Sequence, residues 1–148
     1  MMRISTKFRY GLRAMVDLAS NETKGPVLVK QIADRQRISK KYLDNLLASL
    51  KNAGLVRSVR GAKGGYSLAK PAAKITVHEA AVALEGAPNL VDCVVDPTVC
   101  PHMPYCPTNE FWKSMSETME KFMRGTTLED LVQRSREKQE REAQMYFL

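Results

Sequence analysis

The sequence lacks the residue groupings on which most small enzymes depend. It holds only two histidines, His78 and His102, and it contains no HExxH motif, no set of serine, histidine and aspartate, and no phosphate-binding loop between a strand and a helix. A small redox or metal-dependent enzyme is therefore the most remote of the functions considered below. We expect a protein that is not an enzyme.

Long apolar runs and a closed cysteine framework are also missing. No stretch approaches the roughly 20 apolar residues needed to cross a bilayer, and the N-terminal residues do not resemble a signal peptide. The three cysteines are an odd number, which does not suit a framework of disulfides. We therefore expect a cytoplasmic protein with no membrane partner, whose cysteines are thiols, a redox switch or metal ligands.

Acidic residues are scarce in only one half of the chain. Residues 1–75 contain 16 lysines and arginines against 4 aspartates and glutamates, a net charge of +12, whereas residues 76–148 contain 7 against 12, or −5. A solvated basic surface is the plain interpretation of such an excess. Its concentration in the half that also carries a basic helix and turn favours nucleic acid as the partner.

The stretch 39–66 has the order of a recognition helix followed by a wing. Ser39 caps a predicted helix whose apolar side chains recur at spacings of three and four, namely Leu43, Leu46, Leu47, Leu50 and Ala53. Gly54 ends that helix, and strand-forming residues on both sides of the basic, glycine-rich turn 60–65 predict a hairpin. Two helices precede it. The second is a brief one from Val29 to Gln36, and the first is capped by Ser5 and striped by Phe8, Leu12, Met15, Val16 and Ala19. Together these elements predict a winged helix-turn-helix.

The second half of the chain begins with a helix and then changes composition abruptly. Thr76 and Glu79 form a capping box that opens a helix running to about Glu85. The segment 87–107 holds five of the seven prolines and all three cysteines. Repeated prolines exclude regular structure and make a segment stiff, so we expect an irregular, stiff loop.

A long helix is predicted from Asn109 to Gly125. One face of it carries an apolar stripe of Phe111, Met115, Met119 and Phe122, with Trp112 and Met123 beside it. Such a stripe suits ordinary core or, where little chain is left to cover it, a two-fold dimer interface. A capping box of Thr126 and Glu129 opens a last helix, whose later part is almost wholly charged and polar.

These patterns predict a mainly α-helical fold with a small β-hairpin wing. We divide it into a winged helix-turn-helix DNA-binding domain (1–86), a sensor loop rich in cysteine and proline (87–107), and a dimerisation helix followed by a C-terminal helix (108–148).

The three cysteines are spaced C-x6-C-x5-C, at Cys93, Cys100 and Cys106. Three soft thiolates on one loop can converge on a single centre, and the absence of a C-x2-C pair disfavours zinc. From spacing alone, an iron–sulfur cluster and a set of unligated thiols are about equally good interpretations.

Three segments resemble a family of bacterial winged-helix regulators: ISTKFRYGLRAMVDLA, ISKKYLDNLLASLKNAGLVRSVRGAKGGYSLAKPA and, after the cysteines, TTLEDLV. The family includes the iron–sulfur cluster regulator IscR, the nitric oxide sensor NsrR and the cysteine-metabolism repressor CymR. The likeness runs from Met2 to about Gln133. It implies a homodimeric transcription factor that binds double-stranded DNA operators and dimerises through the long helix.

The resemblance also implies which residues contact DNA. It places Lys41, Asp44 and Asn45 against bases and Arg60 in the minor groove. By their chemistry alone, asparagine suits adenine, aspartate suits cytosine, and lysine and arginine suit phosphates. The predicted DNA-binding residues are Ser39, Lys40, Lys41, Tyr42, Asp44, Asn45, Arg57, Arg60, Lys63, Gly64 and Gly65.

Cluster-bearing members of the family hold a 2Fe-2S or 4Fe-4S cluster on three cysteines, which implies Cys93, Cys100 and Cys106 here. The chain departs from its relatives at the fourth ligand. Some carry a histidine where this chain has Asn109, and others a carboxylate on the first helix of the partner subunit, where this chain has Arg9. The substitutes are a small exogenous ligand or one of His102, Asp92, Asp96 and Glu110.

Two hypotheses therefore share the DNA-binding fold and differ in the signal. In the first, an iron–sulfur cluster on the loop cysteines controls the DNA affinity of the dimer. In the second, the regulator carries no cluster and responds to reversible oxidation of Cys100 or Cys106, or to a protein partner, as the resemblance to CymR allows.

Overall fold

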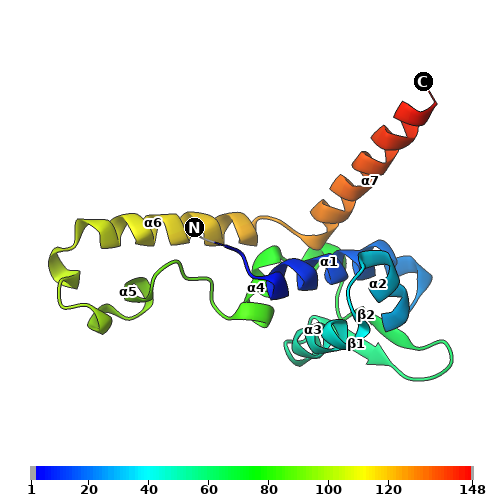
Figure 1. The fold of residues 1–148 in the computed structure, drawn as a ribbon, viewed down its shortest axis with the longest axis horizontal. Helices are drawn as coiled ribbons and strands as arrows, with labels where there is room; N and C mark the ends of the chain where they lie inside the picture. The colour runs from blue at the N-terminus through cyan, green and yellow to red at the C-terminus, as the bar shows by residue number, and fades with distance from the viewer. Residues whose placement is uncertain (1–2, 148) are drawn as a thin grey trace.

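The computed structural model of the protein describes residues 3–147. Residues 1, 2 and 148, at the outer ends of the predicted segments and including Met2 of the family resemblance, lie outside that range. The elements are α1 (Thr6–Ser20), α2 (Val29–Gln36), α3 (Lys40–Asn52), β1 (Val56–Val59), β2 (Gly65–Leu68), α4 (Val77–Glu85), α5 (Asp92–Val95), α6 (Pro107–Arg124) and α7 (Leu128–Tyr146), with short 3₁₀ turns between some of them (Figure 1). The predicted class, mainly helical with one hairpin, is confirmed.

The hairpin follows α3 directly, as a wing follows a recognition helix. β1 and β2 pair antiparallel, with Val56 opposite Leu68 and Val59 opposite Gly65. Val27 bridges Tyr66 on the outer side of β2, which ties the hairpin to the chain before α2. The two strands and the helix-turn-helix therefore form one packed unit.

The core of that unit lies where α1, α3 and α4 meet. The four leucines of α3 are almost completely buried, and each contributes about 1.5–3 kcal/mol of burial free energy. Gly11 allows α1 to approach α4 closely, since a Cβ at Gly11 would lie 2.3 Å from Leu84 Cδ1. Ala53, predicted to face the core, is exposed because it lies just beyond Asn52, the last residue of α3.

All five residues of the stripe predicted for α1 pack in or against the core, and Met15 and Ala19 are buried. The prediction left out three further buried residues of α1, which are Gly11, Ala14 and Leu18. The larger side chains of the stripe pack at the edge of the core and are half-buried: Phe8, Leu12 and Val16.

Most predicted helix ends are confirmed. The side-chain oxygens of Ser5 and Ser39 accept hydrogen bonds from the backbone N–H groups of Phe8 and Tyr42, at 3.0 and 3.2 Å. Gly54, directly after α3, has a φ of +76°, which is the conformation that glycine adopts without strain.

The capping box of α7 was predicted one residue too early. The Thr127 hydroxyl accepts a hydrogen bond from Asp130 N at 3.1 Å, and the Asp130 carboxylate accepts one from Thr127 N at 2.9 Å. Val77 N donates to Thr126 O, and Leu128 N to Ile75 O, both at 2.9 Å. This pairing with the chain before α4 fixes where α7 begins.

The proline-rich segment is more regular than predicted. It contains one helical turn, α5, and the 3₁₀ turns η3 (Pro97–Val99) and η4 (Met103–Tyr105). α6 begins at Pro107, two residues before the predicted start. The reason is that proline, with its fixed φ and missing N–H, suits the first positions of a helical turn, where prolines of this segment lie.

The molecule is elongated because α6 and α7 leave the winged domain in different directions (Figure 1). α6 touches the domain near its C-terminal end, where His78 Nε2 of α4 lies 3.4 Å from Glu120 Oε1. Leu128 and Val132 bury the start of α7, after which its side chains are nearly all exposed. None of the helices within residues 3–147 has the length and apolarity that a membrane crossing requires.

Candidate nucleic-acid interface and cysteine loop

The outer face of α3 is basic and free of large apolar side chains. Lys41 and Asn45 are exposed. Lys40 Nζ lies 3.1 Å from Asp44 Oδ2, an exposed pair worth only about 0.3–0.5 kcal/mol, so both groups can exchange this partner for a base or phosphate. The predicted readers of α3 are therefore accessible together on one face.

The first turn of α3 is held in place by α1. Tyr42 is half-buried, and its ring lies edge-on to that of Tyr10, with the centroids 6.1 Å apart. Ser39 caps the helix, so its hydroxyl is already engaged with backbone. Both residues, predicted to bind DNA, thus have structural roles, and their contact with DNA stays a prediction.

A buried carboxylate fixes α2 against α1. Asp17 is only 5% exposed, and it accepts hydrogen bonds from Arg35 Nε and Nη2 at 2.9 and 2.7 Å and from Gln36 Nε2 at 2.9 Å. The bonds from Arg35 to Asp17 raise the pKa of the guanidinium. Gln36 also accepts hydrogen bonds from Arg13. The turn between α2 and α3 is therefore locked to α1 by polar contacts.

The wing carries its cations on the outside. Arg60 and Lys63 are exposed, and Arg57 Nε donates to Ser67 Oγ across the hairpin at 3.1 Å. Lys51 near the end of α3 donates to Ser58 Oγ at 2.8 Å, so the hairpin is fastened to the C-terminal part of the recognition helix.

Two glycines at the base of the wing turn cannot be replaced without moving the backbone. A Cβ at Gly64 would lie 2.2 Å from Val59 O, and one at Gly65 would lie 2.3 Å from Val27 O. Gly65 also has a φ of +136°. The predicted DNA-binding role of both glycines stays a prediction, but their role in shaping the wing is evident from these distances.

The three cysteines lie on the segment that leads into α6, and all three are half-buried free thiols. Asn109, in the first turn of α6, donates from Nδ2 to Cys93 O at 3.2 Å and to Cys93 Sγ at 3.4 Å. Asn109 thus connects the first cysteine to the helix that begins after the third. Arg9 lies elsewhere, on α1 beside Tyr10.

Cys106 is the residue that precedes α6, where backbone N–H groups stabilise negative charge. Its Sγ lies 3.1 Å from Thr108 Oγ1. Hydrogen bonds from the Thr108 side chain and then from the Asn109 backbone lower the pKa of the Cys106 thiol, which favours the thiolate. Thr108 was not among the predicted site residues, although a hydroxyl two residues after a cysteine at a helix start is visible in the sequence.

The donor atoms suit an iron–sulfur cluster, but their arrangement does not form a site for one. Within residues 3–147, no three side chains of histidine, cysteine, aspartate or glutamate come together as metal ligands would. Of the candidate fourth ligands, Asp96 accepts hydrogen bonds from Thr98 N and Oγ1 at 2.9 and 2.6 Å. The segment would therefore have to close around a cluster.

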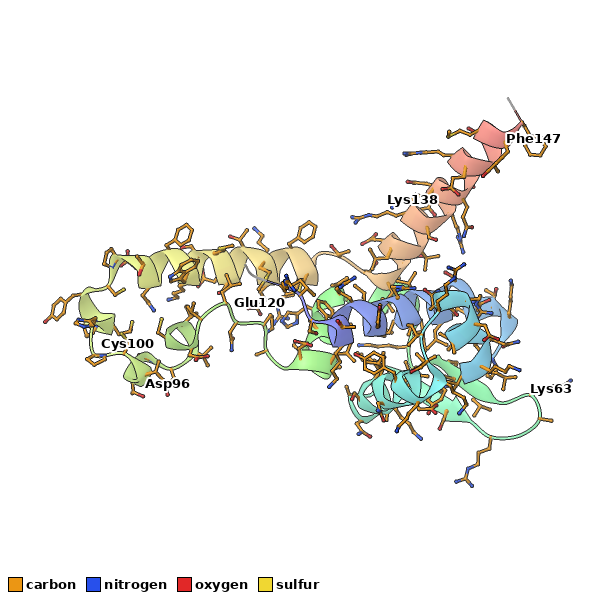
Figure 2. The ribbon with its side chains drawn as sticks, in the orientation of Figure 1. Lys63, Asp96, Cys100, Glu120, Lys138 and Phe147 are labelled. Atoms are coloured by element: carbon orange, nitrogen blue, oxygen red, sulfur yellow. The ribbon has the colours of Figure 1, made fainter. Side chains whose placement is uncertain are left out.

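The cysteines and the wing lie far apart. Figure 2 shows Cys100 at one end of the long axis of the molecule and Lys63 of the wing turn at the other, with α6 extending from the domain toward the cysteines. The cysteine segment is connected to the winged domain by the chain that follows α4 and by α6, which contacts α4.

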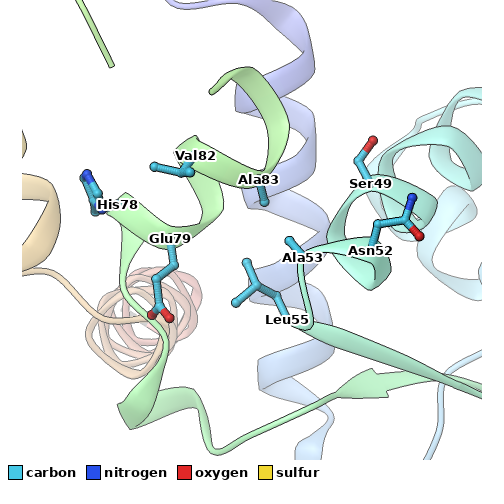
Figure 3. Close-up of a pocket in the computed structure, with 8 residues that line it drawn as sticks. All are labelled: Ser49, Asn52, Ala53, Leu55, His78, Glu79, Val82 and Ala83. Atoms are coloured by element: carbon cyan, nitrogen blue, oxygen red, sulfur yellow. The ribbon is translucent and has the colours of Figure 1, made fainter. Parts of the chain in front are cut away.

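A hollow of about 570 Å³ lies between the end of α3 and α4, lined by Ser49, Asn52, Ala53, Leu55, His78, Glu79, Val82 and Ala83 (Figure 3). It includes none of the cysteines and none of the predicted DNA-binding residues. Its lining includes two titratable side chains, His78 and Glu79, and both are engaged in contacts of the fold, with Glu120 and Lys70 respectively.

Comparison with known proteins agrees with this arrangement. Residues 4–134 match the Rrf2 family model, described as an iron-dependent transcriptional regulator. The chain is 37% identical to the HTH-type transcriptional regulator CymR of Bacillus subtilis over 147 residues, 99% of this chain and 100% of CymR. It is 39% identical to IscR of Klebsiella pneumoniae over 131 residues, 88% of this chain and 80% of IscR.

Solved structures of a CymR and of an IscR superimpose on most of the chain. B. subtilis CymR, described as a global cysteine regulator, gives a TM-score of 0.74 at 38% identity and covers 90% of this chain and 98% of its own. IscR of T. potens gives 0.78 at 37% identity and covers 93% and 91%. The chain therefore belongs to the Rrf2 family of winged-helix transcriptional regulators.

Proposed function

We propose that the protein is a cytoplasmic, homodimeric regulator that binds operator DNA with α3 and the wing and receives its signal at the cysteine loop. One observation carries this proposal: an accessible basic face on α3 continues into a basic wing, at the opposite end of the molecule from the three thiols. Residues 1–86 would then be the output, 87–107 the input, and 108–148 the assembly segment.

Within this proposal, α3 lies in the major groove and the wing follows the phosphates into the adjacent minor groove. Lys41, Asn45 and Arg60, all exposed, are the readers, and Lys40, Arg57 and Lys63 hold the duplex in register. Asp44 becomes free to accept from a base once Lys40 turns to a phosphate, because their pairing is weak.

The DNA-binding proposal is tested by selection of bound duplexes from a random-sequence library. Wild type should enrich a sequence with two half-sites about 34–36 Å apart. Asn45→Ala and Arg60→Ala should each make one position of that sequence less specific, because each substitution removes a specific base contact. At that position the preference for the correct base over the others should fall by about 5- to 150-fold. The measurement is sequencing of the enriched pool.

Asn52→Ala is the matched control, since Asn52 is an exposed asparagine in the last turn of the same helix and lies beside the hollow. It should leave the enriched sequence unchanged. Failure of wild type to enrich any sequence would contradict the proposal, and so would identical sequences from wild type and both variants.

The dimer is proposed to form through α6. Phe111 and Phe122 are 59% and 69% exposed although both lie on the apolar stripe. Met115, Met119 and Met123 of the same helix line a groove of about 540 Å³ against Phe8 and the chain after α4. The stripe is thus half occupied by the winged domain, and a second copy of α6 is the partner that its exposed aromatic edge fits.

For the signal, the first candidate is an iron–sulfur cluster held by Cys93, Cys100 and Cys106. Three thiolates supply soft donors, and a bound cluster would make the loop sensitive to redox state and iron supply. Asn109 already fixes Cys93 beside the start of α6, so this part of the loop is organised in advance. Within residues 3–147 the three thiols do not come together, so they would have to converge to hold a cluster.

The second candidate is a thiol switch without a cluster. It is favoured by Cys106, whose pKa is lowered by Thr108 and by the backbone of Asn109 at the start of α6. A thiolate at this position is the species that peroxides oxidise. Oxidation there would break the contact with Thr108 and disturb the first turn of α6.

Anaerobic purification from iron-replete cells separates the two candidates. With a cluster, the protein is brown, carries iron and sulfide, and becomes colourless when all three cysteines are replaced by serine. With a thiol switch, it is colourless, and peroxide changes the DNA affinity of wild type but not of Cys106→Ser. A colourless protein whose DNA affinity does not change with peroxide would exclude both the cluster and the thiol switch.

A further inference from the structure

The exposed surface beside the first turn of α3 continues onto α1. Tyr10 packs edge-on against Tyr42 of α3, and the guanidinium carbon of Arg13 lies 5.2 Å from the centre of the Tyr10 ring. These three side chains are partly or fully accessible to solvent. They form one continuous aromatic and cationic surface, which we call the α1 ledge.

Arg13 has donors to spare. Its Nε donates to Gln36 Oε1 at 3.3 Å, and its Nη2 donates to Gln36 O. A guanidinium has five N–H groups, so three remain for a further ligand. Within residues 3–147 Arg13 forms no ion pair with a carboxylate, because the nearby Asp17 is satisfied by Arg35 and Gln36.

The ledge and the wing lie at opposite ends of the recognition helix. The wing is fastened near the C-terminal end of α3 through Lys51 and Ser58, whereas Tyr10 contacts Tyr42 in its first turn. The first turns of a recognition helix contact the base edges. A cation fixed beside that turn is therefore placed where the sugar–phosphate strand borders the groove.

We propose that the α1 ledge is a phosphate-binding site on the DNA strand opposite to the one that the wing follows. Arg13 would hold one phosphate through its free N–H groups, and the Tyr10 hydroxyl would donate to the same strand. Both side chains are fixed in advance by Gln36 and by the ring of Tyr42, so little side-chain entropy is lost on binding. The proposal rests on the proposed DNA binding and adds α1 to it.

The test uses the full chain and the duplex that wild type selects from the random library, with a random-sequence duplex of equal length beside it. Arg13→Gln should weaken binding to both duplexes by the same factor, about fivefold to tenfold, and reduce the slope of log K against log salt by about one. Tyr10→Phe keeps the ring on Tyr42 and should weaken both about twofold to fivefold with the slope unchanged, because it removes a neutral donor.

Lys138→Gln is the control for Arg13→Gln, since it removes one charge from the exposed part of α7, away from the winged domain (Figure 2). It should leave affinity and slope unchanged. The thermal unfolding temperature of Arg13→Gln shows whether the substitution disturbs the turn between α2 and α3. If it does, the affinity of Tyr10→Phe is the measurement that decides whether the α1 ledge binds DNA. Wild-type DNA affinity and salt slope in both variants would overturn the proposal that the α1 ledge binds phosphate. Weaker DNA binding that is fully explained by a change in oligomeric state would overturn it too. If wild type selects no duplex, the DNA-binding proposal fails instead.

Discussion

Gly65→Ala should lower the affinity for the selected operator by about 100-fold. The reason is that it removes two contacts between the wing and DNA, that of Arg60 in the minor groove and that of the wing with the phosphates, each worth about 1–3 kcal/mol. The added Cβ would lie 2.3 Å from Val27 O. Val27 and Tyr66 exchange two backbone hydrogen bonds of 2.8 Å at that point. The backbone has to separate there, which detaches β2 from the chain before α2 and displaces the wing.

Gly61→Ala is the matched control for this substitution. Gly61 has a φ of +112°, so alanine is strained there too, but its Cβ would have no neighbour within 4 Å. It should cost about 1–2 kcal/mol of stability through backbone strain alone and leave operator affinity within a few-fold of wild type. Equal operator affinities for the two variants, measured at a temperature where both are folded, would contradict the role given to the wing.

The second large effect is expected from Phe122→Asp on α6. The substitution places a charge on the exposed edge of the apolar stripe. Burying an unpaired carboxylate at a two-fold interface is strongly unfavourable, and by symmetry each of the two copies contributes one such carboxylate. The dimer should dissociate at micromolar concentration. Operator affinity should fall by about 100-fold or more, because a monomer contacts only one half-site.

Sedimentation velocity and operator binding measured on the same samples test this. Phe147→Asp is the control, since Phe147 is 91% exposed at the end of α7, away from α6. It should remain dimeric and bind normally. A Phe122→Asp protein that sediments as a dimer would show that the contact between copies lies elsewhere.

Local sequence signals predicted the elements that carry their own caps. Helices begin where expected at Ser5, at Ser39 and at the pair Thr76 and Glu79. In each case the cap side chain bonds to a backbone N–H three residues later, so the cap depends on no residue distant in the sequence. The start of α7 was missed by one residue because Thr126 and Leu128 are held by backbone bonds to distant residues, which the local pattern does not contain.

The candidate site was predicted in its residue types but not in its contacts. Lysine, asparagine and arginine at the right spacing indicated a DNA surface, and all of those on the outer face are accessible. The support from α1 was missed, since the contact of Tyr10 with Tyr42 joins residues 32 positions apart. The same holds for Asn109 and Cys93, which only the folding of the proline-rich segment brings together.

The junction of α4 and α6 has a mechanical consequence. Glu120 lies 13 residues, or about 20 Å, from Pro107 at the start of α6, so a rotation of about 10° at the contact of His78 with Glu120 would displace that start by about 3 Å. Read in reverse, a shift of that size among the thiols tilts each winged domain by the same small angle. In the proposed dimer the two tilts would add, and the distance between recognition helices would depart from the 34–36 Å that successive major grooves impose. Under this proposal α6 is a lever, and its length sets how large a tilt a given shift at the cysteine loop produces.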